Sequence, residues 1–366
     1  MLSDSEHKMC VVVLFGGMSS EHEVSRVSAG TFVDNLDRAR YEVLTVGITR
    51  EGRWLCTEAT SAQMADGSWE ELPGNMPCVI SPDRADHGMI LFTPDGRVEK
   101  MHLDVVIPVL HGLWGEDGTV QGLLELAGIA YVGCGVLASS VCMDKAVANA
   151  LFEANGVPHT KWVAANRWEI EKDLEGVCAG VEEKLGWPVF VKPANAGSSV
   201  GISKVSSQEE LKAAIALALE NDRKVVFEAF VDGQEVECAV IGSDPAVSTR
   251  PGEILAGAEF YTYDDKYKNG VSQVVIPARL PEEKLDEVKT YAAMAYTALG
   301  CEGLARCDFF VEKDTGRVLI NEINTFPGFT PISMYPKLME HEGIPVPALI
   351  DRLIALALER TEKQHG

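Results

Sequence analysis

The segment LARCDFFVEKDTGRVLINEINTFPGFTPIS, residues Leu304–Ser333, predicts two β-strands joined by a turn at Lys313–Gly316, where Asp and Gly supply the turn chemistry. Successive side chains of a strand point to opposite faces. One predicted face is apolar and holds Cys307, Phe309, Leu319 and Ile323. The opposite face carries polar residues but also includes the apolar side chains Phe310, Val318 and Ile320. A strand that is apolar on both faces is buried, so the segment predicts a hairpin inside the protein.

Four polar side chains share one face of this hairpin. If the chain folds back about Thr315, Asp308 lies opposite Glu322 and Arg306 lies opposite Asn324. Like charges directly opposite each other are destabilising. The two facing carboxylates therefore need a cation between them or a shared proton.

The residue types on this face suit a metal and a phosphate. Carboxylate and amide oxygens are hard ligands for Mg²⁺, which completes its shell with water and substrate phosphates. Arg306 carries a permanent charge on a planar fork that fits carboxylate or phosphate. The alternative is a solvated strand face with salt bridges, but buried charges require a partner. We interpret the hairpin as a metal–phosphate site.

Composition limits the class of protein. The chain has 366 residues, which predicts roughly two to three domains of about 150 residues. Its net charge of −23 argues against nucleic acid and anionic membrane as partners. Nine cysteines without a CxxC pair indicate reduced thiols in the cytoplasm. The apolar run Met9–Phe15 is too short for a signal peptide or a membrane span.

The beginning of the chain predicts a doubly wound sheet. A buried strand at Cys10–Phe15 leads through two glycines into a helix, for which Ser20 and Glu23 form a capping box. A dinucleotide-binding domain would need G-x-G-x-x-G here, and GGMSSE does not match it. Glu21 would repel a pyrophosphate and attract an ammonium group. Its alternative role is that of an acid favoured at a helix N-terminus.

Two further strands, Tyr41–Ile48 and Val105–Leu110, belong to the same predicted sheet, and His111 directly follows the second. Ligands of open α/β sheets lie beyond the carboxyl ends of the strands, where Glu21 and His111 both fall. A structural histidine is the alternative for His111. The intervening residues Thr49–Glu99 are rich in Gly, Pro, Asp and Ser and decorate this domain.

Two loops in the middle of the chain predict ligand contacts. The strand Pro188–Lys192 runs into the Gly/Ser loop PANAGSSVG, which can cradle phosphate with backbone N–H groups and one lysine. It is not a Walker A loop, and a plain hairpin loop is the alternative. The long aromatic and charged loop Glu259–Gly270 predicts a lid, with Lys266 and Tyr267 as its best candidates for ligand contact. A helix at Ala138–Asn155 precedes both loops.

Seven motifs in order resemble the D-alanine–D-alanine ligases of the ATP-grasp superfamily: LFGGMSSEHEVS, HGLWGEDGTVQG, ASSVCMDK, FVKPANAGSSVGISKV, FYTYDDKY, LARCDFF and NEINTFPGFTPISMYP. The resemblance covers nearly the whole chain. It implies an α/β fold, α+β in the C-terminal part. An N-terminal doubly wound domain at 1–133 would precede two α+β subdomains, 134–228 and 229–366, that sandwich ATP.

The resemblance also implies a nucleotide and metal site. ATP would be bound by Lys145, Lys192, the Ala196–Gly201 loop with Ser199, Glu228 on the adenine side, Val231, Glu235 at the ribose, and Lys266 of the lid. Two Mg²⁺ ions, for which Mn²⁺ can substitute, would be held by Asp308, Glu322 and Asn324. One departure is Ala229, since some relatives have Lys directly after the adenine-side glutamate.

The implied substrates are two D-alanine molecules. Glu21 would take the ammonium of the first, with His111 nearby and with Ser198 and Tyr267 bracing Glu21. Arg306 and the Gly328 backbone would form the oxyanion hole. Ser333 would bind the carboxylate of the second D-alanine.

The implied reaction is ATP-dependent formation of D-alanyl-D-alanine through a D-alanyl phosphate, for peptidoglycan precursors. Ligation of D-serine or D-lactate is the nearest alternative, and Tyr267 favours the dipeptide over the depsipeptide. A non-catalytic nucleotide-binding protein of the same fold would be expected to lose Arg306 or metal ligands, and all are present. The resemblance further suggests a homodimer.

Overall fold

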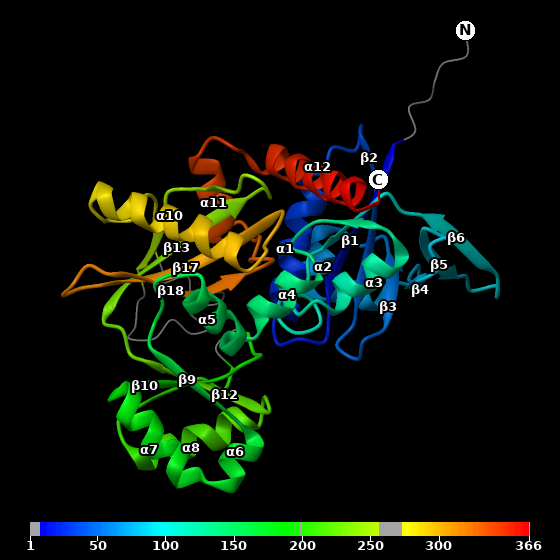
Figure 1. The fold of residues 1–366 in the computed structure, drawn as a ribbon. Coiled ribbons are helices and arrows are strands. Elements are labelled where there is room, and N and C mark those ends of the chain that lie inside the picture. Colours follow the sequence, from blue (N-terminus) through cyan, green and yellow to red (C-terminus); the bar gives the residue numbers. More distant parts are fainter. Residues whose placement is uncertain (1–7, 198–199, 256–272, 366) are drawn as a thin grey trace. The chain divides into compact units, whose positions relative to one another are not determined.

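The computed structural model describes residues 8–197, 200–255 and 273–365 (Figure 1). The chain forms two compact units. Unit 1 comprises Met1–Val136 together with Phe326–Gly366, and unit 2 comprises Leu137–Thr325. The C-terminal segment thus packs with the N-terminal part of the chain. No helix in the described residues is long and apolar enough to cross a membrane.

Unit 1 is built on an eight-stranded sheet in the order β6-β5-β4-β3-β2-β1-β7-β8. β1 pairs in parallel with β2 and β7, and β8 continues the parallel part beside β7. The segment between β2 and β7 extends the sheet with antiparallel strands β3 to β6, so the predicted decoration is part of the sheet. The strands are β1 (Met9–Gly16), β2 (Tyr41–Ile48), β3 (Trp54–Thr57), β4 (Met76–Ile80), β5 (Gly88–Phe92), β6 (Val98–His102), β7 (Val105–Pro108) and β8 (Ala130–Tyr131).

Helices cover this sheet. Val12 and Leu14 of β1 share a core with Val120 and Leu124 of α3, while α1 packs along β1 and α12 along β7 and β8. On α12, Arg360 donates to the carbonyl of Gly133 at 2.5 Å, which ties the C-terminal helix to the sheet. The helices are α1 (His22–Asn35), α2 (Ser61–Asp66), the 3₁₀ turn η1 (Ser68–Glu71), α3 (Thr119–Ala127), α11 (Met334–His341) and α12 (Val346–His365).

The predicted capping box at Ser20 and Glu23 is wrong. Helix α1 begins at His22, its N-cap is Glu21, and no side chain caps it. The reason is that the chain after β1 is shaped by Ser19, whose hydroxyl accepts from the Glu21 N–H at 3.1 Å. Glu23 is drawn instead to Arg50, with which it forms an ion pair.

Unit 2 contains two sheets. The first is four-stranded in the order β11-β10-β12-β9, and helices α6, α7 and α8 pack on it around a core that includes Phe227. Its elements are β9 (Trp162–Asn166), α6 (Arg167–Lys172), α7 (Leu174–Leu185), β10 (Val189–Pro193), β11 (Ser203–Val205), α8 (Gln208–Leu219) and β12 (Lys224–Ala229).

The second sheet has six strands in the order β16-β15-β13-β17-β18, with β14 beside β13, and helix α10 packs on it. Its elements are β13 (Gly233–Ile241), β14 (Val247–Ser248), β15 (Gly252–Leu255), β16 (Gln273–Val275), α10 (Glu282–Ala298), β17 (Leu304–Glu312) and β18 (Val318–Asn324). The chain passes from the first sheet to the second between Ala229 and Gly233, but a division of unit 2 into 134–228 and 229 onward stays a prediction.

The predicted single helix at Ala138–Asn155 is two helices, α4 (Val136–Met143) and α5 (Lys145–Ala154). Asp144 separates them as the N-cap of α5, because its carboxylate accepts from the backbone N–H groups of Ala146 and Val147. An aspartate at such a position satisfies amide groups that would otherwise lack an intrahelical partner.

The hairpin of β17 and β18 has the predicted turn and the predicted pairs: Arg306 lies opposite Asn324, and Asp308 lies opposite Glu322. Beyond Asp308 the register shifts by one residue, and Phe309 pairs with Ile320. Asn321 is the extra residue of this bulge.

The bulge corrects the prediction for the remainder of β18. Because a one-residue shift moves side chains to the opposite face, Ile320 and Val318 lie on the Phe309 face, and Leu319 lies on the polar face. The polar side chains of β17 are half-buried while the alternate ones are buried.

Candidate active site

The polar face of β17 and β18 holds a compact cluster around Asp308. Arg306 donates twice to this carboxylate, from Nε to Oδ1 and from Nη2 to Oδ2, both at 2.7 Å. The Asn324 amide donates to Asp308 Oδ2 at 3.0 Å. The side chains of Arg306 and Asp308 are 14% and 13% exposed. Three of the four predicted side chains are therefore in direct contact.

A third strand adds an acid that sequence reasoning missed. Glu237 of β13 lies opposite Asp308, and Asp308 lies opposite Glu322, so three carboxylates form a row across neighbouring strands. Glu237 Oε2 is 3.0 Å from Arg306 Nε. The signal in the sequence is the alternation of Glu235 and Glu237 in β13, but it is informative only once β13 is known to pair with β17.

This row fits a divalent cation by its chemistry. Facing carboxylates and an amide oxygen are the hard ligands that Mg²⁺ prefers, and the row has more negative charge than Arg306 alone balances. Among the described residues no group of three or more His, Cys, Asp or Glu side chains is already gathered as a metal site. A metal here would thus rely on Asp308, Glu322, Asn324 and ligands from a bound nucleotide.

Lys192 and Glu228 form a buried ion pair on the four-stranded sheet. Their Nζ and Oε2 atoms are 2.6 Å apart, and the side chains are 11% and 6% exposed. Asn149 donates to the other oxygen of Glu228 at 3.1 Å, and Lys192 also donates to Asn321 of the β18 bulge at 3.4 Å. The bulge thus brings an amide toward this lysine.

The pKa of Lys192 reflects the acids around it. Burial lowers it, but the carboxylates of Glu228, Glu322 and Glu235 raise it, and the net pKa lies above its usual value. Lys192 therefore stays charged among acids that the resemblance assigns to the adenine, metal and ribose contacts. Glu235 itself is exposed, and Val231 is half-buried in the segment between β12 and β13.

Lys145 lies at the first turn of α5, next to the glycine-rich loop. Its Nζ donates to the Ala196 carbonyl at 2.8 Å, and its backbone N–H donates to the Ala194 carbonyl at 3.0 Å. Asp144 meanwhile pairs with Lys224 at 2.6 Å. The start of α5 is thereby fixed against the loop after β10.

In unit 1, Glu21 and His111 both lie beyond the carboxyl ends of parallel strands, as predicted, and their loops are in contact. A Cβ added at Gly112 would lie 2.7 Å from Glu21 Oε2, so the carboxylate lies against the backbone of Gly112, whose φ of +71° already favours glycine. Ser19 links the two loops, because its hydroxyl donates to the His111 carbonyl at 2.7 Å. Both residues follow carboxyl ends of parallel strands.

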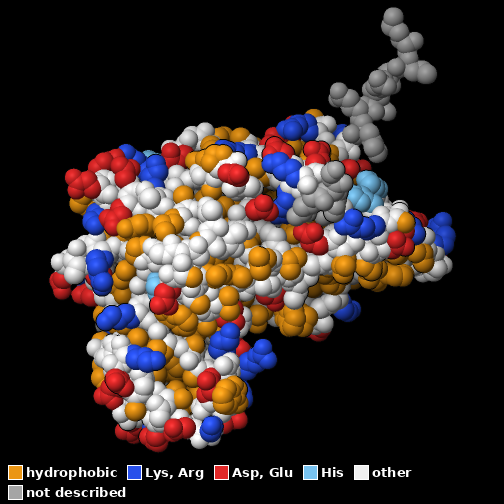
Figure 2. All heavy atoms as spheres, in the orientation of Figure 1, with side chains coloured by type: hydrophobic (Ala, Val, Ile, Leu, Met, Phe, Trp, Pro, Cys, Tyr) orange, Lys and Arg blue, Asp and Glu red, His pale blue; other side chains and the backbone are white. Residues whose placement is uncertain are grey.

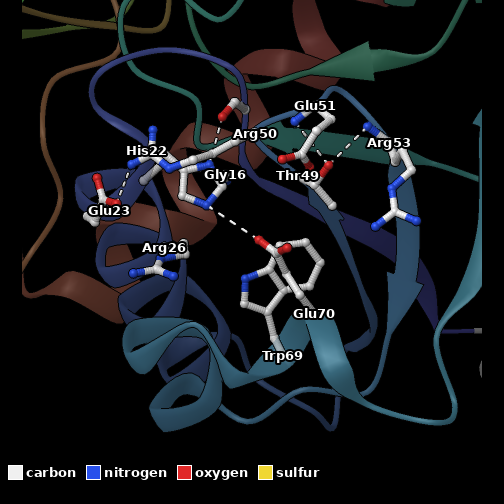
Figure 3. Close-up of polar contacts among 12 residues, drawn as sticks. Gly16, His22, Glu23, Arg26, Thr49, Arg50, Glu51, Arg53, Trp69 and Glu70 are labelled. Atoms are coloured by element: carbon white, nitrogen blue, oxygen red, sulfur yellow. Dashed lines mark hydrogen bonds and ion pairs between the residues drawn. The ribbon is translucent and has the colours of Figure 1, made fainter.

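The chain around Glu21 is supported by His22, which is buried (Figure 3). Its Nδ1 contacts the Gly17 carbonyl at 2.7 Å, and its Nε2 faces Glu70 at 3.9 Å. Burial is the main reason that the pKa of His22 is below its usual value; Arg50 and Arg26 lower it further, and the Gly17 carbonyl and Glu23 raise it. Figure 3 shows Arg26, Arg50 and Glu70 around the imidazole.

His111 is buried and joins two parts of unit 1 that are distant in sequence. Its Nδ1 contacts the Phe326 carbonyl at 2.9 Å, and its Nε2 contacts the Ser28 hydroxyl at 3.1 Å. Ser28 also accepts from the Phe329 N–H at 3.1 Å. These contacts fix the segment that contains Gly328, so His111 has a structural role in addition to any ligand contact.

Glu116 also fixes this segment. Its carboxylate accepts from the Gly112 N–H at 2.8 Å and from the Phe326 N–H at 2.9 Å. Ser333 is the N-cap residue of α11, and its hydroxyl accepts from the Thr330 N–H at 3.0 Å. Sequence reasoning did not identify Glu116, although it lies within HGLWGEDG.

Four residues of the predicted site belong to segments that the structure does not describe. Ser198, Ser199, Lys266 and Tyr267 lie outside the described residues. Glu21, His111, Gly328 and Ser333 belong to unit 1, and Lys145, Lys192, Glu228, Glu235, Arg306, Asp308, Glu322 and Asn324 belong to unit 2. On the face drawn in Figure 2, acidic and basic side chains are interspersed.

Comparisons with known proteins agree with the motifs. Residues 10–134 match the family model described as D-ala D-ala ligase N-terminus, and residues 151–355 match the one described as D-ala D-ala ligase C-terminus. The chain is 49% identical to the D-alanine–D-alanine ligase of Acetivibrio thermocellus, over 96% of each chain. It is 48% identical to that of Caldicellulosiruptor bescii, over 98% of each.

Solved structures agree as well. The VanG D-Ala:D-Ser ligase from Enterococcus faecalis superposes with a TM-score of 0.87 at 38% identity, covering 96% of this chain and 100% of the other. The D-alanine–D-alanine ligase from Coxiella burnetii superposes with a TM-score of 0.84 at 34% identity, covering 98% and 97%.

Proposed function

The chain belongs to the D-alanine–D-alanine ligase family, and from that premise we propose that it joins two D-alanine molecules at the expense of ATP through a D-alanyl phosphate. It has the ATP-grasp fold and is an ADP-forming ligase that serves peptidoglycan synthesis. The residue assignments rest on the contacts of Arg306 and Asn324 with Asp308. These contacts gather the proposed oxyanion donor and metal ligands on one face of the hairpin of β17 and β18.

Unit 2 supplies the nucleotide and metal side of the proposed site. Lys145, Lys192, Lys266 and the loop that includes Ser199 bind the phosphates, and Glu228, Val231 and Glu235 bind the adenosine. Two Mg²⁺ ions, replaceable by Mn²⁺, are held by Asp308, Glu322 and Asn324. When bound, such ions neutralise the charge on the phosphate oxygens.

Glu21 and His111 of unit 1 belong to the proposed site of the first amino acid. Glu21 binds the ammonium of D-alanine, supported by the Ser19 and His22 contacts described above, with His111 nearby and with Ser198 and Tyr267 bracing the carboxylate. The substrate's own carboxylate then attacks the γ-phosphorus of ATP, the bond to the β-bridging oxygen breaks, and ADP leaves. Positioning and charge neutralisation are what phosphoryl transfer requires of these residues.

The second half of the reaction forms the amide. The amine of the second D-alanine, held through its carboxylate by Ser333, attacks the acyl carbon and gives up a proton to solvent. Inorganic phosphate leaves with the C–O bond electrons. Arg306 and the Gly328 N–H stabilise the oxyanion of the tetrahedral intermediate. Each such donor is typically worth about 3–4 kcal/mol of transition-state stabilisation.

The identity of the second substrate is the point to test first. Similarity to the VanG D-Ala:D-Ser ligase makes D-serine the main competitor, whereas the curated relatives at 48–49% identity are D-alanine–D-alanine ligases. The purified protein should be assayed for ADP and for ligation product with D-alanine alone, then with D-serine or D-lactate added. Dipeptide from D-alanine alone supports the proposal, and product only with D-serine or D-lactate refutes it.

We also propose a cytoplasmic homodimer. The nine cysteines, none of which is in a disulfide, suit a reducing compartment. The family resemblance suggests the dimer. Light scattering after size exclusion distinguishes the expected dimer from a 39.7 kDa monomer.

A further inference from the structure

Glu237 lies on β13, the strand that flanks β17 on the side away from β18, and none of the assignments above uses it. It is 7% exposed on β13, directly opposite Asp308. Its carboxylate lies 3.0 Å from Arg306 Nε. Glu322 and Asn324 lie on β18, on the other side of β17. Arg306 therefore lies near two carboxylates: that of Asp308, two residues further along β17, and that of Glu237 on the neighbouring strand β13.

The proposed function makes competing demands on Asp308 and Arg306. Asp308 is to bind metal, yet both of its oxygens accept from Arg306. Arg306 is to donate to an oxyanion, yet the Nε and Nη2 groups of its fork are held by Asp308. The bidentate contact weakens the negative charge that Asp308 offers to a cation and holds two of the five guanidinium N–H groups, so both roles are served better if it loosens while the guanidinium keeps its place.

We propose that Glu237 is a positioning residue for Arg306: its carboxylate holds the guanidinium in place when Asp308 binds the metal ion. This inference rests on the proposed function and assigns Glu237 no contact with substrate.

Burial makes the second acid necessary. The Arg306 side chain is 14% exposed and that of Glu237 10% exposed. A half-buried guanidinium deprived of its carboxylate is left as a poorly compensated charge, which is strongly unfavourable. Without Glu237, Arg306 would therefore stay on Asp308 and compete with the metal. With Glu237, the guanidinium exchanges one carboxylate for another at little cost.

The first test replaces the charge but keeps the shape. Glu237→Gln is expected to lower kcat about tenfold or more, less than loss of an oxyanion donor itself, with the KM for ATP changed less than threefold. The matched control is Glu253→Gln. Glu253 is also a buried glutamate of the same sheet paired with an arginine, Arg279, at 2.8 Å, but it lies opposite Val236 and thus on the other face. This control should keep kcat within twofold.

The second test measures metal affinity without turnover. Mn²⁺ is titrated by electron paramagnetic resonance against each protein with a non-hydrolysable ATP analogue. Glu237→Gln should weaken Mn²⁺ binding at least fivefold, because Arg306 then holds Asp308. In an Arg306→Ala background the same substitution should change Mn²⁺ affinity less than twofold. A double-variant cycle of this kind isolates the coupling between the two residues.

The outcomes separate the proposals. If the wild-type protein forms no ligation product, the proposed function fails; if it is active and Glu237→Gln retains wild-type kcat and Mn²⁺ affinity, only the role of Glu237 fails. An equal loss of Mn²⁺ affinity in both backgrounds would mean that Glu237 acts on the metal through its negative charge and not through Arg306, which would overturn the inference. If Glu237→Gln does not fold, Glu237→Asp, which keeps the charge, is measured instead. It should retain Mn²⁺ affinity within threefold, and a larger loss of affinity counts against the proposal.

Discussion

Arg306 and Asp308, two residues apart on β17, face each other with two parallel hydrogen bonds of 2.7 Å. Residues i and i+2 of a strand share a face, so the pair needs no tertiary contact to form. Its partners across the sheet, Asn324 and Glu237, connect it to the neighbouring strands.

Arg306→Ala should abolish dipeptide formation while leaving ATP binding mostly intact, because the side chain stabilises charge that develops during reaction. We expect kcat to fall by about 10²–10³-fold, measured by ADP release and dipeptide formation, with calorimetry for the nucleotide. Arg317→Ala is the control: Arg317 is on the same hairpin and pairs with Glu312 at 2.7 Å, but it is 63% exposed. Near-wild-type turnover in Arg306→Ala would remove its oxyanion role.

Glu21→Gln should raise the apparent KM for the first D-alanine by at least tenfold, since the amide cannot neutralise an ammonium group. Initial rates at varied D-alanine and saturating ATP measure it. The control is Glu23→Gln, because Glu23 is exposed and pairs with Arg50. An unchanged KM would leave Glu21 with only its position at the start of α1.

Lys192→Met should lower the free energy of unfolding by about 3–5 kcal/mol, because it leaves the Glu228 carboxylate buried without its cation. The double variant Lys192→Met/Glu228→Leu should recover part of this loss. Lys212→Ala, which breaks a pair with Glu175 that is 37% and 72% exposed, should cost under about 1 kcal/mol. Urea unfolding of all three checks these values. A loss as small as that of Lys212→Ala would mean that Glu228 is otherwise compensated.

His22 predicts a pH-dependent stability. Its pKa is lower in the folded protein than the usual 6.5, so the unfolded chain binds its proton at a higher pH. The stabilisation is complete above about pH 6.5 and is lost as the pH falls toward the folded-state pKa. Urea unfolding at several pH values from 7.5 to 5 should show a shallower loss in His22→Gln than in the wild type. His341→Gln, at an exposed position, should retain the wild-type slope; equal slopes in all three proteins would contradict the prediction.

Sequence patterns predicted the elements of the site best where contacts are local. The strand Tyr41–Ile48 is an example of a correct prediction, and the start of α5 at Lys145 is an example of a missed one. The strand has the predicted bounds, whereas the helix prediction missed the break at Asp144. Apolar periodicity continues across Asp144, and only the capping contacts of its carboxylate reveal where α5 begins.

Long-range contacts explain most of what was missed. Glu237 acquires its place from the pairing of β13 with β17, and Glu116 from its bonds to Gly112 and Phe326. The pairing of β13 with β17 and the bond from Phe326 to Glu116 follow no spacing rule along the chain, because each joins segments that are distant in sequence.

By itself, the sequence determined the parallel strands that begin near Cys10, Tyr41 and Val105, the turn of the hairpin and the facing of Asp308 and Glu322. A two-residue period and a short turn set the register of the hairpin. The tertiary structure alone decided the bulge at Asn321, the neighbour β13 and the return of Phe326–Gly366 to unit 1. These depend on which surfaces bury one another, and a side chain's burial is a property of the packed molecule, not of its position in the chain.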